Sequence, residues 1–584
     1  MSRKKIISLI IFLFLFIIFL GFISFLYFEL KQPVILPRKA YLEVKLSGQV
    51  VDRPAVEPIR ELLFGPPTVS LHDLWINLNK AKEDERIRCL LIHLGPLICD
   101  WGKVNELREF IKDWRTSGKK VYFYVEELPE ADREYYLASA GDKIILHPLG
   151  WMGINGLGGH IPFFKKTLKK IGLNLEVEKI EEYKTAYNPF TEEKFTPAHR
   201  EMITSLNEDI FKEYVSTVAQ SRGLTEEQFV NLLNQGLFQG KQAKEKGLVD
   251  DVLFPDELSE LMKEEGQKLT RVTIGTYSRV GAKRKGPYRG KRIAILYAQG
   301  PILNGEGPST IIASDNVSRW LRQIREDRRI KAVVLRIDSP GGSAVGSDII
   351  WREVVLTRKV KPIVVSMSDV AGSGGYWIAM AASKIVAHPQ SLTGSIGVLA
   401  AKLDLSELYK KAGINAERLV FGEHADMYST FRPLSKEEKD QLKDQIRWTY
   451  DQFLERVAEG RGKNKDEIDK IGRGRVWTGK QAQEIGLVDE LGGLKRALEL
   501  ARQLAGIPRD EEIKLDVWPK KLSLFSLLFK RSENSFVSGL YPSFSTLNLV
   551  QLLLKENLLA LMPFDFCLNE MGLFRLINLD NYCF

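Results

Sequence analysis

The sequence predicts an α/β protein made of two copies of one fold. The chain has 584 residues, more than one hydrophobic core usually supports, so two or three domains are expected. Short apolar runs alternate with longer helical stretches, a pattern typical of parallel strands packed under helices. The two halves also share sequence segments. A content of 44% hydrophobic and 27% charged residues is that of a folded globular protein.

The internal repeat defines the two predicted domains. Residues 240–250 read GKQAKEKGLVD and residues 479–489 read GKQAQEIGLVD, identical at nine of eleven positions. Upstream, DKIILHP matches SKIVAHP, and ERIRCLLIHL matches RRIKAVVLRI, at offsets between 239 and 243 residues. This period is far longer than the roughly 20 to 50 residues of a solenoid repeat. We therefore expect related α/β domains at 40–278 and 293–507.

A hydrophobic segment precedes the first domain. Residues 6–28 are 23 uncharged, mostly Ile, Leu and Phe positions, long enough to span a bilayer as a helix. Three basic residues within 1–5 predict a cytoplasmic N-terminus, which places the domains on the other side of the membrane. The segment is longer than a signal-peptide core and lacks a small-residue cleavage site, so we expect an uncleaved anchor.

The net charge of +9 is concentrated between the domains. Residues 279–292 contain seven basic and no acidic residues, so the rest of the chain carries only about +2. We expect a solvated linker there, or a contact with anionic lipid, and no nucleic-acid partner. The four cysteines lack metal-ligand spacing, so no metal site is predicted. Residues 508–584 are apolar but too interrupted to span a membrane, and their role stays open.

Each half keeps reactive residues that the other lacks. LTGSIGV at 392–398 aligns with WMGINGL at 151–157, which puts Ser395 opposite Ile154. At the same offset, Lys184 falls opposite Ala425. The loop DSPGGSAVG, with Gly341 and Gly342, follows a strand of the second half, whereas its counterpart LGPLICDWG has no Gly pair.

These residues are the parts that acyl transfer needs. A serine hydroxyl becomes a good nucleophile when a base removes its proton, and a lysine desolvated enough to lose its charge can do this. Backbone N–H groups of a Gly-Gly turn can approach and stabilise the oxyanion. Neither residue is distinctive alone, and Glu181 and Glu182 are expected to raise the pKa of Lys184, the wrong direction for a base.

Ser373 offers a second interpretation. Together with His388 it could form a serine/histidine pair, but His147-Pro148 repeats His388-Pro389 in a half where Asp132 replaces the serine. A histidine retained without its serine favours a structural role for His388. Ser373 could instead orient Lys184 as a polar neighbour.

At these residues the chain resembles the signal peptide peptidase A (protease IV) family in its long, duplicated form. The matching motifs are RIDSPGGS, AGSGGYWIA, LTGSIGV, EEYKTAYNPF and the paired GLVD segments. The resemblance covers roughly residues 40–510 and the anchor. It implies two tandem Clp-protease/crotonase-like domains, with Ser395 as nucleophile, Lys184 as general base and Gly342 as oxyanion donor.

The resemblance also implies a setting for the reaction. It predicts a serine endopeptidase without cofactors, held in the bacterial inner membrane with its domains on the periplasmic side, that degrades cleaved signal peptides and similar apolar peptides. It further implies a homotetramer. The competing hypothesis is an inactive or acyl-CoA-binding crotonase-like membrane scaffold, for which Ser395 and Lys184 would be dispensable.

Overall fold

The computed structural model describes residues 35–54, 68–264, 266–280 and 290–520, together with Gly21 and the strand at 559–561. The predicted anchor at 6–28 lies outside these residues apart from Gly21, as do most of the linker (281–289) and most of the chain after residue 520. Within the described residues, no helix has the length and apolar character needed to cross a bilayer.

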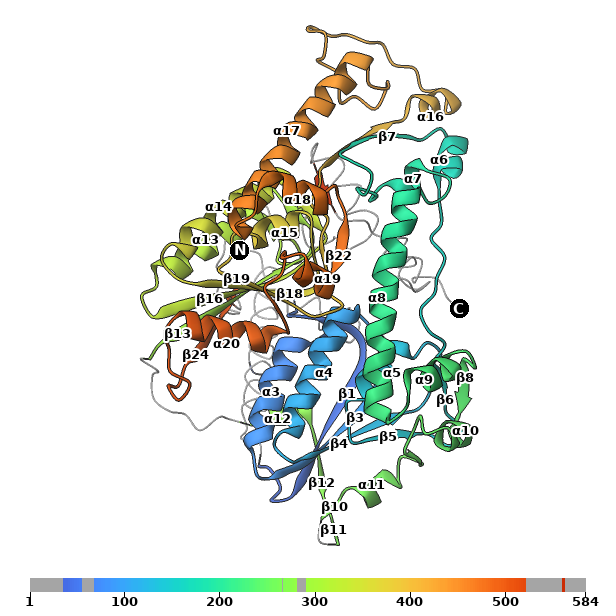
Figure 1. Ribbon diagram of the computed structural model, residues 1–584, viewed down its shortest axis with the longest axis vertical. Coiled ribbons are helices and arrows are strands. Elements are labelled where there is room, and N and C mark those ends of the chain that lie inside the picture. The colour runs from blue at the N-terminus through green and yellow to red at the C-terminus, as the bar shows by residue number, and fades with distance from the viewer. Residues whose placement is uncertain are drawn as a thin grey trace, which may run out of the picture.

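The first half is built on a sheet of parallel strands. Its order is β12–β1–β3–β4–β5–β9, with β2 paired to β1. These strands span β1 Ala40–Val51, β2 Thr68–Ser70, β3 Ile87–Ile98, β4 Lys120–Val125, β5 Lys143–Leu146, β9 Asp251–Val252 and β12 Thr270–Thr273. Helices α3 (Leu71–Glu83), α4 (Trp101–Arg115), α5 (Asp132–Ala138) and α8 (Pro197–Arg222) lie beside it in Figure 1.

The second half repeats the main strand order of this sheet and adds β20 (Leu392–Gly394) and β22 (Val476–Thr478) beside β18. The order β24–β13–β16–β18–β19–β23 has the same connectivity, again with parallel pairing. The strands are β13 Arg292–Gln299, β16 Ile330–Ser339, β18 Ile363–Gly372, β19 Lys384–Ala387, β23 Glu490–Leu491 and β24 Lys514–Trp518. Strand β24 lies beyond residue 507, where the second domain was expected to end. The predictions of a mixed α/β fold and of a duplicated chain are confirmed.

Equivalent side chains hold equivalent positions in the two halves. The Tyr135 hydroxyl donates to the Leu248 carbonyl at 2.8 Å, and the Tyr376 hydroxyl donates to the Leu487 carbonyl at 2.9 Å. Helices α8 and α17 (Lys436–Arg461) each have 26 residues and end at a left-handed glycine. The paired GLVD segments therefore match in sequence because they close the same sheet in each half.

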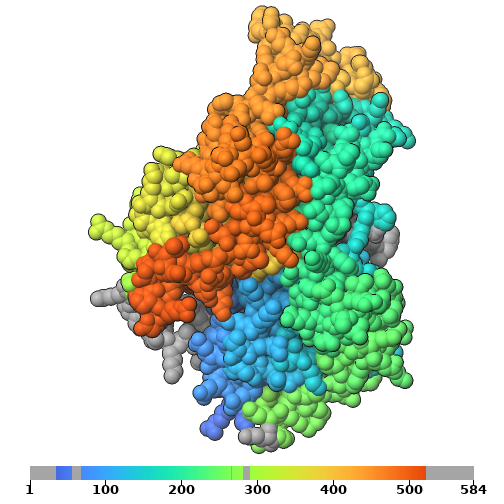
Figure 2. Space-filling view, in the orientation of Figure 1, coloured from blue at the N-terminus to red at the C-terminus, as the bar shows by residue number. Residues whose placement is uncertain are grey.

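A third sheet joins the halves. Its order is β15–β14–β17–β25–β21–β7. Strand β7 (Asn174–Lys179) belongs to the first half and pairs antiparallel with β21 (Leu399–Asp404) of the second. The others are β14 Ile302–Leu303, β15 Ile312–Ala313, β17 Gly341–Ser343 and β25 Leu559–Leu561. In Figure 2 the teal surface of the first half lies along the orange surface of the second.

The remaining elements cover these sheets or connect them. The helices are α6 Lys165–Ile171, α7 Asn188–Thr191, α9 Glu226–Leu233, α10 Gly240–Glu245, α11 Leu258–Leu261, α12 Ile274–Ser278, α13 Ser314–Glu326, α14 Ala344–Arg358, α15 Gly374–Ala379, α16 Ser406–Lys411, α18 Lys465–Ile471, α19 Gly479–Glu484 and α20 Leu494–Leu504. The strands are β6 Trp151–Gly153 paired with β8 Leu237–Gln239, and β10 Lys263–Glu264 paired with β11 Gln267–Lys268.

Buried ion pairs cross between the two halves. Lys103 of α4 lies 2.6 Å from both Asp338 and Asp369 of the second half. Arg336 of β16 contacts Asp52 at 2.9 Å and Glu106 at 2.8 Å, and all three of these side chains are buried. Because an unpaired buried charge is costly, each half completes the other electrostatically.

Candidate active site

Lys184 of the first half meets Ser395 of the second half in the protein interior. The Lys184 Nζ lies 3.0 Å from the Ser395 Oγ and 2.9 Å from the Ser395 carbonyl oxygen. The Ser373 Oγ lies 2.7 Å from the same Nζ. All three side chains are 0% exposed. The structure thus brings together the two residues that sequence comparison singled out, and Ser373 with them.

Ser395 occupies a strained turn directly after β20. Its φ of 50° is in the left-handed region, which is unfavourable for a residue other than glycine. Strand β20 is held on both sides, by β18 and by β22, and the Ser395 N–H donates to the Arg475 carbonyl at 2.6 Å. This backbone bonding fixes the turn that presents the hydroxyl to Lys184.

Lys184 reaches the second half because the chain follows β7 across the third sheet. Beyond β7, the Ile180 N–H donates to the Val398 carbonyl at 3.0 Å and the Tyr183 N–H to the Arg473 carbonyl at 3.2 Å. Gly474 (φ 83°) packs against the Lys184 backbone so closely that a Cβ there would lie 2.5 Å from the Lys184 nitrogen. The backbone of the second half therefore seats the lysine.

Burial lowers the pKa of Lys184 well below its ordinary value. The expectation that the adjacent glutamates would raise this pKa is wrong. Glu181 pairs with Arg447 at 3.0 Å and Glu182 pairs with Arg473 at 3.2 Å, so both carboxylates are engaged by arginines at the rim. A neutral amine beside a serine hydroxyl is the state that a general base requires.

Ser373 lies in a second strained turn, between β18 and α15. Its φ is 54°, and its N–H donates to the Gly394 carbonyl at 2.8 Å, one residue before Ser395. Its hydroxyl can donate to the Gly397 carbonyl, 3.4 Å away, while it accepts from Lys184. Ser373 therefore accepts a hydrogen bond from the amine while its own backbone is tied to the residue before Ser395.

The Gly341–Gly342 loop lies next to this turn. A Cβ added to Gly374, the residue after Ser373, would lie 3.2 Å from the Gly342 nitrogen. Gly342 has a φ of 152°, and a Cβ there would lie 2.1 Å from the Ile302 carbonyl oxygen. Only glycine fits this position, and the Gly pair packs beside the turn that carries Ser373.

His388 belongs to a different environment. Its Nε2 lies 3.2 Å from Glu106 of α4, and its Nδ1 lies 3.7 Å from Glu109. Burial lowers the pKa of His388, but the Glu109 and Glu106 carboxylates outweigh burial and raise it. Ser373 contacts Lys184 instead, so the structure separates the two members of the alternative serine/histidine pair.

The equivalent position in the first half is filled differently. Asp132, opposite Ser373, accepts hydrogen bonds from the Asn155 and Gly156 N–H groups and from the Tyr214 hydroxyl. Ile154, opposite Ser395, is fully buried. A carboxylate bonded to the turn after β6 and an apolar side chain therefore stand where the second half has Ser373 and Ser395.

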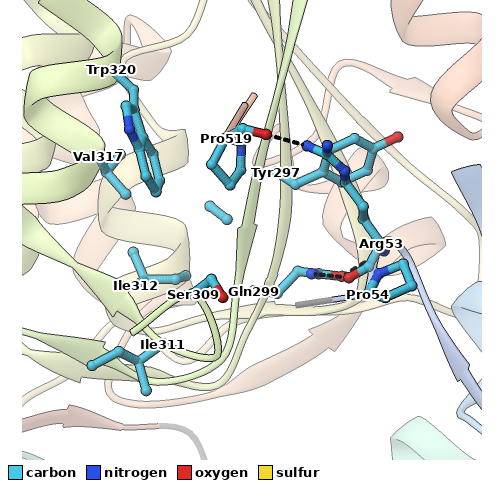
Figure 3. Close-up of a pocket in the computed structure, with 11 residues that line it drawn as sticks. Arg53, Pro54, Tyr297, Gln299, Ser309, Ile311, Ile312, Val317, Trp320 and Pro519 are labelled. Carbon is cyan, nitrogen blue, oxygen red and sulfur yellow. Dashed lines mark hydrogen bonds between the residues drawn. The ribbon is translucent and has the colours of Figure 1, made fainter. Parts of the chain in front are cut away.

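A small hollow lies elsewhere in the molecule (Figure 3). It is lined by Arg53, Pro54, Tyr297, Ala298, Gln299, Ser309, Ile311, Ile312, Val317, Trp320 and Pro519. Arg53 closes one side of it by donating to the Pro519 carbonyl at 2.6 Å, and its backbone pairs with the Gln299 side chain. These residues are not those of the Lys184–Ser395 site.

Sequence reasoning missed Gly474, although a signal was present. At the offset of 239 that aligns β8 with β22, Gly474 falls opposite Gln235, so this glycine occurs in one copy only. The same comparison that identified Ser395 and Lys184 could have identified it. The arginines that pair with Glu181 and Glu182 carried no such signal, because they lie more than 260 residues away in the chain.

Comparison with known proteins matches both halves to one family. A model of peptidase family S49 matches residues 113–269 and 356–508. The chain is 36% identical to the chloroplastic serine protease SPPA of Arabidopsis thaliana, over 76% of this chain and 67% of that protein. It is 31% identical to protease 4 of Haemophilus influenzae, over 77% of this chain and 75% of that one.

A shorter relative and two solved structures match between 35% and 41% of the chain. A putative signal peptide peptidase SppA of Enterococcus faecium is 34% identical over 36% of this chain and 62% of its own length. A ClpP1 mutant from Listeria monocytogenes covers 35% of this chain and 94% of its own (TM-score 0.24, 16% identity). A 1510-N membrane-bound stomatin-specific protease mutant with a substrate peptide covers 41% and 97% (TM-score 0.26, 14% identity).

Proposed function

Because the chain belongs to peptidase family S49, we propose that it is a membrane-anchored serine endopeptidase with Ser395 as nucleophile and Lys184 as general base. The observation that carries this assignment is the buried contact of 3.0 Å between the Lys184 Nζ and the Ser395 Oγ. In this proposal the two copies of the fold have divided one active site, the first supplying the base and the second the nucleophile.

The reaction follows from this geometry. Neutral Lys184 takes the proton of the Ser395 hydroxyl as the oxygen attacks a peptide carbonyl. The Gly342 N–H, with Gly341 shaping the loop, stabilises the oxyanion, and protonated Lys184 then gives its proton to the leaving amine. A water molecule, deprotonated by Lys184, hydrolyses the acyl-enzyme. Ser373 keeps the amine directed at Ser395 through both steps.

We place the substrates among extended apolar peptides, in particular cleaved signal peptides. The name of the Enterococcus faecium relative supports this class, and the predicted anchor at 6–28 would hold the site near the membrane that retains such peptides. The proposed setting is the periplasmic side of a bacterial inner membrane, as a homotetramer without a cofactor. Peptides would bind by pairing with strand edges beside the site.

Labelling and peptide hydrolysis together test this assignment. The full-length protein in detergent should react with a fluorophosphonate and cleave an apolar signal-peptide sequence. Ser395→Ala and Lys184→Met should each lose at least about 1000-fold in peptide cleavage. Ser391→Ala is the matched control, because Ser391 is also buried and its hydroxyl donates to the Ser368 carbonyl at 2.6 Å. Equal labelling of all four proteins would mean that the site is inactive and would favour the scaffold hypothesis.

A further inference from the structure

One strand of the third sheet comes from far outside the two domains. Strand β25, Leu559–Leu561, lies between β17 and β21 and pairs antiparallel with both. It is separated in sequence from the last strand of the second half, β24, by residues 519–558. An extended chain spans about 3.3 Å per residue, so residues 519–558 are long enough to let β25 pair at many places. The position of β25 must therefore be explained by the two strands that it pairs with.

The two strands that hold β25 are the two edges of the candidate active site. Strand β17 is the Gly341–Ser343 segment that contains the proposed oxyanion donor. Strand β21 begins at Leu399, four residues after Ser395. Neighbouring strands lie about 4.8 Å apart, so a gap of one strand between β17 and β21 accepts a single extended peptide. Pairing with these two edges is how an extended substrate would bind.

The register places the segment at the reaction centre. Ala560 is opposite Gly342, Leu561 is opposite Gly341, and Leu559 is opposite both Ser343 and Leu399. The backbone between Leu559 and Leu561 thus runs along the oxyanion loop. The sequence there is Leu-Ala-Leu, an apolar tripeptide of the class proposed as substrate. Ser395 has no exposed surface in this arrangement.

We propose that residues 559–561 are an internal ligand of the substrate groove, so that the chain's own C-terminal segment competes with peptide substrates. This inference rests on the proposed function, because it takes the gap between β17 and β21 as the place where substrates pair. While the segment occupies the gap between β17 and β21, another peptide can bind only to those molecules in which the gap is free. The apparent dissociation constant of that peptide is its intrinsic value divided by the free fraction. The connection through the chain makes this competition intramolecular.

Binding of a peptide probe to full-length protein in detergent tests the proposal. The probe is a fluorescein-labelled copy of residues 556–563, and the protein carries Ser395→Ala so that no cleavage is needed. Ala560→Pro or Leu561→Pro is then added to this protein. Each proline removes a backbone N–H and crowds the strand beside it. The two variants disturb different neighbouring strands, because the backbone N–H groups of adjacent residues point to opposite sides of a strand. Each should tighten probe binding about 10-fold, measured by fluorescence anisotropy.

The control is Asn569→Pro, a proline placed in the same C-terminal region but outside the paired residues. It should bind the probe as the Ser395→Ala parent does. Equal affinity in the parent and both paired-segment variants overturns the proposal, as does an equal gain in Asn569→Pro or an absence of probe binding in all of them. If the proposed function itself is wrong, the protein that retains Ser395 will not cleave peptides, and this result is independent of the binding measurements.

Discussion

Lys184 can act as a base only if its amine is neutral, and its surroundings provide for this. It is fully buried, and burial alone lowers its pKa. The Ser395–Lys184 pair could be predicted from the sequence, because Ser395 has no counterpart serine in the first half and Lys184 has no counterpart lysine in the second. The effect of the glutamates could not be predicted, since it depends on Arg447 and Arg473, which reach them only in the fold.

The 2.7 Å contact between the Ser373 Oγ and the Lys184 Nζ predicts a positioning role for Ser373, and its removal should have a recognisable signature. Ser373→Ala should lower kcat about 10- to 100-fold, because the amine loses the hydroxyl that directs it. The lost hydrogen bond also stabilised the ammonium form, so the midpoint of the kcat/KM pH profile should move to lower pH. Ser391→Ala should change neither quantity. An unaltered pH profile for Ser373→Ala would remove Ser373 from the account.

Gly342 is predicted to be irreplaceable. A Cβ there would lie 2.1 Å from the Ile302 carbonyl oxygen, so Gly342→Ala should displace the oxyanion loop. We expect kcat/KM to fall about 100- to 1000-fold, comparable to the loss of an oxyanion donor. Gly275→Ala is the control, because a Cβ at Gly275 meets nothing within 4 Å. Peptide-cleavage kinetics within twofold of the unmodified protein would place the oxyanion site elsewhere.

Strand β7 is the element that turns two related halves into one site. It crosses from the first half to pair with β21, and the chain beyond it delivers Lys184 to Ser395. Alternating apolar runs and helices predicted the two main sheets, because the central strands such as β3, β16 and β18 are continuous, mostly buried apolar runs. The third sheet could not be predicted, since its short strands come from both halves and from residues beyond 520.

The seat that Gly474 provides for this segment can be tested by itself. Gly474→Ala should push the Lys184 backbone away and lower kcat about 100-fold, the cost of a misplacement of roughly 1 Å. Gly413→Ala is matched to it, because Gly413 also has a positive φ (71°) but no atom within 4 Å of an added Cβ. Equal peptide-cleavage rates for the two variants would mean that backbone strain, and not displacement of Lys184, explains any loss.

At the scale of the whole molecule, ion pairs between the halves join them in addition to the third sheet. Repeated segments predicted two copies of one fold, and the matching strand orders confirm this. The ion pairs between the halves could not be predicted, because Lys103 and its two aspartate partners lie in segments that do not correspond to each other in the internal repeat. The duplicated fold thus has an interface of its own in addition to two similar cores.

Lys103 is expected to be critical for stability. Lys103→Met leaves the buried Asp369 and the half-buried Asp338 without their cation, which should cost about 3 to 5 kcal/mol in the free energy of unfolding. The melting temperature should fall by roughly 3 to 5 °C, measured by differential scanning calorimetry. Lys410→Met, which removes an exposed pair with Glu407, should leave it unchanged. A melting temperature equal to that of the unmodified protein would contradict the proposed role of this interface.

One half of the chain is proposed to supply the base for a nucleophile in the other. The most direct test of this proposal is the rate at which a fluorophosphonate labels Ser395 as a function of pH, in the full-length protein and in Lys184→Met. Since the neutral amine is the active form and burial lowers its pKa, labelling should rise with pH through a single ionisation well below 10.5. Lys184→Met should label at least about 100-fold more slowly and without that ionisation. The same rate and the same pH dependence in both proteins would contradict the account.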